Sequence, residues 1–265
     1  MNVMPANLHI ESTGTGPNLV LLHGWGMHSA VWQPLVKKLG RLFTLHLVDL
    51  PGMGLSRPIE PFHLYALAEK IAEMLPANAD MMGWSLGGQV AMRMAIDHPE
   101  SVRKLILVGT TPKYLNHLNK QNWDAGIEPE VFNSFVNNLN IDYHKTMTQF
   151  LTLQCMGADE TRATVKLLRK KFAERPVPTA QILQKALNIL LETDLRAEVP
   201  QLRKSTLLIH GGRDTLVPVQ AAHWMMQNLP TGYLRVIAGA SHAPFLSHQA
   251  QFIEAVVQFL KPEGP

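Results

Sequence analysis

A serine between two glycines constrains the fold of this chain more than any other feature of its sequence. The run Gly83-Trp84-Ser85-Leu86-Gly87 closes an apolar stretch at 80–84 and precedes amphipathic residues at 89–97. The first stretch predicts a buried strand and the second predicts a helix. Glycines on both sides of Ser85 permit a sharp turn between these elements, which lifts the hydroxyl clear of the sheet. The pattern therefore predicts a serine nucleophile at a strand-to-helix turn.

Strand-like apolar runs alternate with helical runs through most of the chain. The patterns predict strands at 19–22, 43–48, 80–84, 105–108, 206–210 and 234–237. They predict helices at 89–97, 219–228 and 249–260. This alternation is typical of a mostly parallel central sheet that is flanked by helices, so we predict an α/β fold.

The pattern changes between residues 112 and 194, where no strand-like run occurs. Amphipathic segments follow one another there, at 130–139, 143–155, 160–174 and 179–191. Because strands resume after this segment, we interpret 112–194 as a helical cap inserted into one α/β core. That core is formed by residues 1–111 and 195–265.

Composition and charge exclude several classes of protein. Of 265 residues, 46% are hydrophobic and 17% are charged, which is typical of a globular domain. A net charge of +3 is too small to indicate a nucleic-acid partner. No apolar run approaches the roughly 18 residues that cross a membrane, and Met1–Ile10 does not resemble a secretion signal. We therefore expect a soluble cytoplasmic protein with no membrane partner.

Cysteine and histidine usage gives no sign of a cofactor. The single cysteine, Cys155, cannot form an internal disulfide, and it lacks the glycine-bounded turn of a nucleophile. The 12 histidines show no paired spacing that is typical of a zinc site. We expect neither a metal nor another cofactor.

A serine nucleophile needs a base and a carboxylate that orients the base. Asp214 follows the predicted strand at 206–210, and His242 follows the last predicted strand. The order Ser85, Asp214, His242 is the order that a glycine-bounded serine turn uses in an α/β sheet. The structural alternatives are a helix-capping Ser85 and a turn-forming Asp214. We interpret His23, His210 and His223 as surface or structural residues rather than as catalytic ones.

The same chemistry needs donors for a tetrahedral oxyanion. The expected donors are the backbone N–H of Leu86 and an N–H from the loop after an earlier strand. Trp25, in His23-Gly24-Trp25-Gly26, is the candidate for the second donor. The alternative for Trp25 is a tryptophan that only fills the core.

These motifs together resemble the α/β-hydrolase superfamily over nearly the whole chain. Within it, the chain is similar to the carboxylesterases of biotin synthesis that act on a pimeloyl methyl ester held by acyl-carrier protein. The similar features are Trp84 and Leu86 beside the serine, Trp25, the cap segment 150–157 and the cap exit 193–196.

This resemblance implies hydrolysis of the methyl ester through an acyl-enzyme on Ser85, which leaves a free carboxylate and methanol. It implies a catalytic triad of Ser85, Asp214 and His242. It also implies that substrate contacts come from Trp25, Ser85, Leu86, His242 and an acyl channel formed by Phe150, Leu151, Thr152, Leu153 and Gln154. The alternative for the channel segment is a helix that only buries its apolar side chains.

Positive charge is concentrated in the predicted cap. Seven basic and three acidic side chains lie between 145 and 175, a net charge of +4, whereas the whole chain carries +3. Such a surface suits an acidic acyl-carrier protein, although a solvated helix face is the alternative. The predicted docking residues are Lys145, Arg162, Lys166 and Arg169. The related pattern has arginine where this chain has Lys145, Gln149 and Lys166.

Two other functions fit the same sequence features. A carbon–carbon bond hydrolase of aromatic degradation would use the same triad. A ligand-binding module without catalysis could use the same fold and pocket. The sequence leaves the preferred acyl length open, and we expect a monomer.

Overall fold

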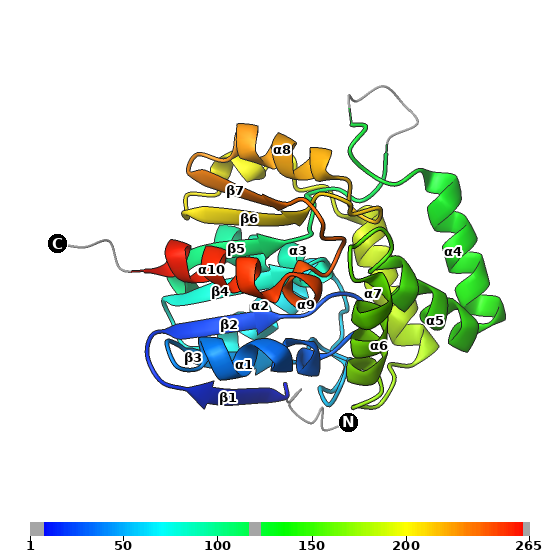
Figure 1. Ribbon diagram of the computed structural model, residues 1–265, viewed down its shortest axis with the longest axis horizontal. Coiled ribbons are helices and arrows are strands. Elements are labelled where there is room, and N and C mark those ends of the chain that lie inside the picture. The colour runs from blue at the N-terminus through cyan, green and yellow to red at the C-terminus, as the bar shows by residue number, and fades with distance from the viewer. Residues whose placement is uncertain (1–7, 117–122, 262–265) are drawn as a thin grey trace.

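One sheet runs through the centre of the molecule (Figure 1). The computed structural model describes residues 8–116 and 123–261. Within these ranges seven strands pair in the order β1-β3-β2-β4-β5-β6-β7. Their bounds are β1 (Ile10–Gly14), β2 (Asn18–Leu22), β3 (Thr44–Val48), β4 (Ala79–Trp84), β5 (Val102–Val108), β6 (Thr206–Gly211) and β7 (Gly232–Ile237). Only β1 is antiparallel to its neighbour, so the predicted mostly parallel sheet is confirmed.

Helices cover both faces of this sheet. Alternate residues of β2 show why: Val20 and Leu22 join one buried apolar cluster, and Leu19 and Leu21 join another. The first cluster contains side chains of α2 (Leu64–Met74), α3 (Leu86–Asp97) and α8 (Val219–Asn228). The second contains side chains of α1 (Gln33–Leu39), α9 (Pro244–Ser247) and α10 (Gln249–Leu260). A strand that is buried on both faces needs apolar residues at consecutive positions, which is the pattern that predicted it.

Further helices come between β5 and β6 in the chain. They are α4 (Pro129–Ile141), α5 (Tyr143–Leu153), α6 (Thr161–Phe172) and α7 (Ala180–Glu192), and they gather beyond the carboxyl ends of the strands (Figure 1). The chain leaves and re-enters the sheet region at one place, where the Leu195 N–H donates to the Pro112 carbonyl oxygen at 2.9 Å. The boundaries 112 and 194 of the predicted cap stay a prediction.

Parts of the predicted core and cap, residues 1–7, 117–122 and 262–265, lie outside the described residues. None of the helices inside the described ranges combines the length and the apolar character that crossing a membrane requires.

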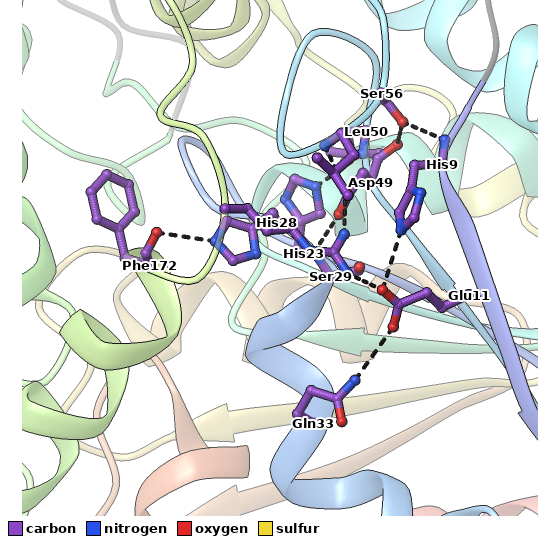
Figure 2. Close-up of polar contacts among 12 residues, drawn as sticks. His9, Glu11, His23, His28, Ser29, Gln33, Asp49, Leu50, Ser56 and Phe172 are labelled. Atoms are coloured by element: carbon purple, nitrogen blue, oxygen red, sulfur yellow. Dashed lines mark hydrogen bonds and ion pairs between the residues drawn. The ribbon is translucent and has the colours of Figure 1, made fainter.

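Ion pairs and hydrogen bonds join the inserted helices to the core. Arg175, which follows α6, is 8% exposed in its side chain and pairs with both Asp49 and Glu11. His28 Nε2 donates to the carbonyl oxygen of Phe172 at 3.1 Å. Figure 2 shows Asp49, Glu11 and His28 on the core side of this junction. Because Arg175 and Asp49 are 126 positions apart, their pairing fixes tertiary rather than local structure.

We predict that Arg175→Leu lowers the free energy of unfolding by about 3 kcal/mol, because Asp49 would stay buried without its cation. The matched control is Lys70→Leu, which breaks a 2.9 Å pair with the half-exposed Glu73 on α2. That control should cost less than about 1 kcal/mol. Urea unfolding followed by circular dichroism measures both. Equal stability of Arg175→Leu and the parent would show that this pair does not hold the helices.

Candidate active site

The turn between β4 and α3 carries Ser85. Ser85 has φ 56° and ψ −120°, a conformation that residues other than glycine rarely adopt. Its side chain makes no capping bond to α3, so the helix-capping alternative is wrong. The glycines allow close packing here, since a Cβ on Gly83 would lie 2.2 Å from the carbonyl oxygen of Gly87. A Cβ on Gly87 would lie 2.5 Å from the carbonyl oxygen of Leu22 in β2.

His242 and Asp214 form a buried pair at the ends of β7 and β6. The Nδ1 atom of His242 lies 2.7 Å from Oδ2 of Asp214. Oδ1 of Asp214 accepts the backbone N–H groups of Leu216 and Val217, each at 2.9 Å. Burial alone would raise the pKa of Asp214, but the contact with His242, the nearby His210 and the Val217 N–H hold it below its usual value. The carboxylate therefore stays ionised and fixes the imidazole through Nδ1.

The hydroxyl of Ser85 faces the same space as His242. Both residues line one cavity, together with Tyr114. Within the described chain, the Ser85 Oγ has one hydrogen-bonding partner, the Tyr114 hydroxyl at 3.0 Å, and no bond joins it to His242. Tyr114 was not expected from the sequence, because the run Thr111-Pro112-Lys113-Tyr114 has no local pattern that marks a site.

The loop after β2 passes close over Ser85. A Cβ on Gly24 would lie 3.2 Å from the Cβ of Ser85. Among the described residues, the backbone N–H groups of Trp25 and Leu86 donate no hydrogen bond to the chain. The indole Nε1 of Trp25 donates to the carbonyl oxygen of Leu183 in α7 at 3.0 Å. Trp25 is thus buried in the core and also lines the cavity, while its role and that of Leu86 stay predictions.

Two hydrogen bonds of the buried His23 ring hold this loop in place. Its Nδ1 lies 2.8 Å from the carbonyl oxygen of Gly24, and its Nε2 accepts the Leu50 N–H at 2.9 Å (Figure 2). These partners require a neutral ring that carries its proton on Nδ1. Full burial lowers the pKa of His23 to about 4, which keeps it neutral. His210 is also a buried structural residue, since its Nε2 donates to the Val217 carbonyl oxygen at 2.8 Å.

The cavity beside Ser85 has a volume of about 260 Å³ and a mostly apolar lining. The inserted helices supply most of its wall. The aromatic and aliphatic side chains that line it include Phe132, Phe135, Phe150, Leu153, Leu187, Leu190 and Leu216. Exposed polar residues, Ser134 and Asn138 on α4 and Gln149 on α5, line another part of the wall, where the cavity meets solvent.

Only two residues of the predicted channel segment line this cavity, Phe150 and Leu153. Leu151 and Thr152 lie off the cavity side because a helix presents every third or fourth residue to one side, and Gln154 follows the last residue of α5. Substrate contacts from Leu151, Thr152 and Gln154 stay a prediction. The side chains of Leu151 and Thr152 lie away from the cavity. Leu151 joins the apolar cluster on the other side of α5, and Thr152 accepts a hydrogen bond from Arg169 at 3.1 Å. Gln154 is buried, and its carbonyl oxygen accepts the His242 N–H at 3.1 Å.

Sequence reasoning missed the contribution of α4 and α7 to the cavity. Phe132 and Phe135 on α4, and Leu187 and Leu190 on α7, are apolar residues three positions apart. This spacing indicates one helix face but does not say which partner covers the face. The sequence therefore shows that α4 and α7 each have an apolar face. It does not show that these faces point toward the cavity.

The predicted docking residues all lie on the surface of α5 and α6. Arg162, Lys166 and Arg169 are exposed on α6, which contributes no residue to the lining of the cavity. Lys145 is exposed on α5, one helical turn before Gln149 at the solvent side of the cavity. In the described ranges no group of three or more His, Cys, Asp or Glu side chains could hold a metal ion.

The sheet, the serine turn and the His242–Asp214 pair define an α/β hydrolase. The sequence model of the family described as alpha/beta hydrolase fold matches residues 17–249, and the chain belongs to this family.

Three relatives that this chain covers nearly from end to end carry the name Pimeloyl-[acyl-carrier protein] methyl ester esterase. The protein of that name from Nitrosomonas europaea is 45% identical over 248 residues, which are 94% of this chain and 97% of the relative. The Nitrosospira multiformis protein is 38% identical, with 96% and 98% of the two chains covered. The Vibrio vulnificus protein is 40% identical, with 97% and 99% covered.

Solved structures of low sequence identity share the same fold. An esterase from Exiguobacterium antarcticum superposes with a TM-score of 0.88 at 22% identity, covering 97% of this chain and 96% of the other. A bromoperoxidase from Bacillus anthracis gives 0.87 at 22% identity, with 98% of each chain covered. At this identity the likeness concerns the fold alone.

The buried neutral His23 predicts a loss of stability in acid. The unfolded chain binds a proton at this histidine below about pH 6.5, whereas the folded chain does so only near pH 4. The contribution of the neutral His23 ring to the free energy of unfolding is therefore complete above pH 6.5. It is lost as the pH falls toward 4, by on the order of 3 kcal/mol. Burial lowers the pKa of His28 and His210 as well, which adds loss in the same direction.

Urea unfolding of the parent and His23→Gln between pH 4 and 7.5 measures this effect. The variant should be less stable at neutral pH and should lose less stability on acidification. Parallel pH profiles for the two proteins would contradict the prediction.

Proposed function

We propose that this chain is a serine carboxylesterase that hydrolyses the methyl ester of pimeloyl-[acyl-carrier protein]. The observation that carries the proposal is the placement of Ser85 and His242 at one apolar cavity, with His242 bonded to the buried Asp214. The names of relatives at 38–45% identity over nearly the whole chain support the substrate. The products are the free carboxylate on the carrier and methanol.

In this proposal Nε2 of His242 takes the proton of Ser85 as Oγ attacks the ester carbonyl carbon. The backbone N–H groups of Trp25 and Leu86 hold the resulting oxyanion. His242 then gives its proton to the departing methoxy oxygen, and methanol leaves an acyl-enzyme on Ser85. A water molecule that is deprotonated by His242 hydrolyses this intermediate. Asp214 keeps the ring in the required tautomer throughout.

The inserted helices supply the acyl site. An apolar wall that includes Phe150, Leu153 and Leu187 suits a methylene chain, which gains free energy when it leaves water. Asn138 and Gln149 lie at the solvent side of the cavity. In this proposal the acyl chain of the substrate continues there toward its carrier protein. We propose that residues 112–194 serve as a cap that shapes this site.

Carrier docking uses the basic surface of the cap. Lys145, Arg162, Lys166 and Arg169 are exposed and form no ion pair among the described residues. An acidic carrier protein would be steered to this surface by charge complementarity. The carrier would then deliver its acyl arm into the cavity from the side of α5.

Ser85→Ala should abolish turnover of pimeloyl-carrier methyl ester, with a loss of about 10⁴-fold or more, because the triad acts as a unit. The parent should release methanol and free pimeloyl-carrier, as measured by mass spectrometry of the carrier. A dienone substrate of a carbon–carbon bond hydrolase serves as the control and should not be cleaved. Comparable turnover by Ser85→Ala would refute the nucleophile, and an inactive parent would refute the substrate.

Reversing Arg162, Lys166 and Arg169 to glutamate should slow turnover of the carrier-bound ester by roughly tenfold at low salt, and less at high salt. A small nitrophenyl ester should be hydrolysed at the parent rate, because it brings no acidic protein surface.

The matched control reverses three exposed basic residues in the last turn of α1 and just after it, namely Lys37, Lys38 and Arg41. This variant carries the same change in net charge on the core and should keep the parent rate for both substrates. If the cap and core variants behave alike, the basic surface of α6 does not dock the carrier.

A further inference from the structure

Tyr114 places a phenol hydroxyl against the candidate nucleophile. Its oxygen lies 3.0 Å from the Ser85 Oγ, and the side chain lines the cavity that also contains His242. Tyr114 is buried. A buried tyrosine hydroxyl needs a hydrogen-bonding partner, and here the partner is the atom on which the chemistry depends.

The backbone around Tyr114 is fixed on both sides. The carbonyl oxygen of Tyr114 accepts the Ile127 N–H at 2.7 Å. The preceding residue, Lys113, pairs with Asp194 at 2.8 Å, where the chain returns to the core. The phenol is therefore held beside Ser85 by bonds that do not involve the site itself.

Hydrogen-bond capacity decides the direction of this contact during the reaction. A serine hydroxyl has one proton and accepts bonds through its lone pairs. When that proton points to Nε2 of His242, Tyr114 can only donate to Oγ. Burial raises the pKa of Tyr114 above its usual value, so the phenol keeps the proton that it donates.

We propose that Tyr114 is a further catalytic residue, which donates a hydrogen bond to the Ser85 Oγ and stabilises the negative charge that develops there. This inference rests on the proposed esterase function. Charge develops on Oγ twice, first as Ser85 loses its proton to His242 and again as Oγ leaves the acyl-enzyme. A hydrogen bond to a charged oxygen is stronger than one to a neutral hydroxyl, so the contact favours the transition states over the resting enzyme.

The proton balance of each step is complete without ionisation of Tyr114. In acylation the Ser85 proton moves to Nε2 of His242, the bond from Oγ to the carbonyl carbon forms, and methoxide leaves with that proton. In deacylation water gives a proton to His242 and its oxygen bonds to the carbonyl carbon. The bond to Oγ then breaks, and the proton on His242 returns to Oγ. Tyr114 keeps its own proton in both steps.

The test compares Tyr114→Phe with Tyr143→Phe. Tyr143 is a matched control, because its hydroxyl donates to the Pro178 carbonyl oxygen at 3.3 Å and it does not line the cavity. Two rates are measured, turnover of the methyl ester and labelling of Ser85 by a phosphonate. Labelling requires attack by Oγ but not the proposed substrate.

Tyr114→Phe should lower kcat and the labelling rate by about tenfold each, the factor that one hydrogen bond of ordinary strength supplies. KM should stay unchanged, and Tyr143→Phe should behave as the parent. Unchanged or faster labelling by Tyr114→Phe would overturn the proposal. A parent that is labelled at Ser85 but does not cleave the pimeloyl ester would overturn the substrate alone.

A second variant separates the hydroxyl from any effect of the substitution on folding. Replacing Tyr114 by 3-fluorotyrosine keeps the ring and the hydroxyl but makes the hydroxyl a stronger donor. Labelling at or above the parent rate supports the proposal, whereas a fall to the rate of Tyr114→Phe overturns it.

Discussion

The close approach of α3 to the sheet is the constraint on which the rest of the site depends. Ser85 is held at a positive φ of 56° with ψ −120°, a sparsely populated conformation that costs about 1–3 kcal/mol for a residue with a side chain. Bonds from the end of β5 hold it there. The Ser85 N–H donates to the Val108 carbonyl oxygen at 3.0 Å, and Thr110 Oγ1 donates to the Ser85 carbonyl oxygen at 2.7 Å. The N–H and the carbonyl oxygen of Ser85 are thus both bonded, which fixes its backbone. Its side chain lines the cavity.

Parallel strands bring the remaining groups to the same edge. The carboxyl ends of β2, β5, β6 and β7 are followed by Trp25, Tyr114, Asp214 and His242 respectively. Residues far apart in the chain therefore meet around Ser85 at the end of β4. The loops that leave this edge start beside Ser85, and this explains why chemistry-bearing residues recur just after predicted strands.

This geometry also explains what the sequence could predict. Strands buried on both faces read as continuous apolar runs, so β2 to β6 were recognisable. A glycine-bounded turn marked Ser85, and Asp214 was recognisable from its place after the predicted strand at 206–210. The edge strand β1 was not, because its run Ile-Glu-Ser-Thr-Gly is mostly exposed and has no apolar pattern. Tyr114 was not either, because its importance comes from a contact across 29 positions. The channel segment at 150–154 was predicted as a continuous stretch, whereas α5 presents only Phe150 and Leu153, three positions apart, to the cavity.

The inserted helices and the candidate oxyanion loop are mechanically connected. The insertion touches the loop after β2 through Trp25, whose indole is bonded to Leu183 of α7, and through His28, which is bonded to Phe172 of α6. A third connection runs through Asp49, which pairs with Arg175 and also accepts the Ser29 N–H at 2.7 Å. A shift of α6 and α7 would therefore move the backbone that carries the Trp25 N–H. Because α7 also lines the cavity through Leu187 and Leu190, the same helix contacts both the cavity and the loop that carries the Trp25 N–H.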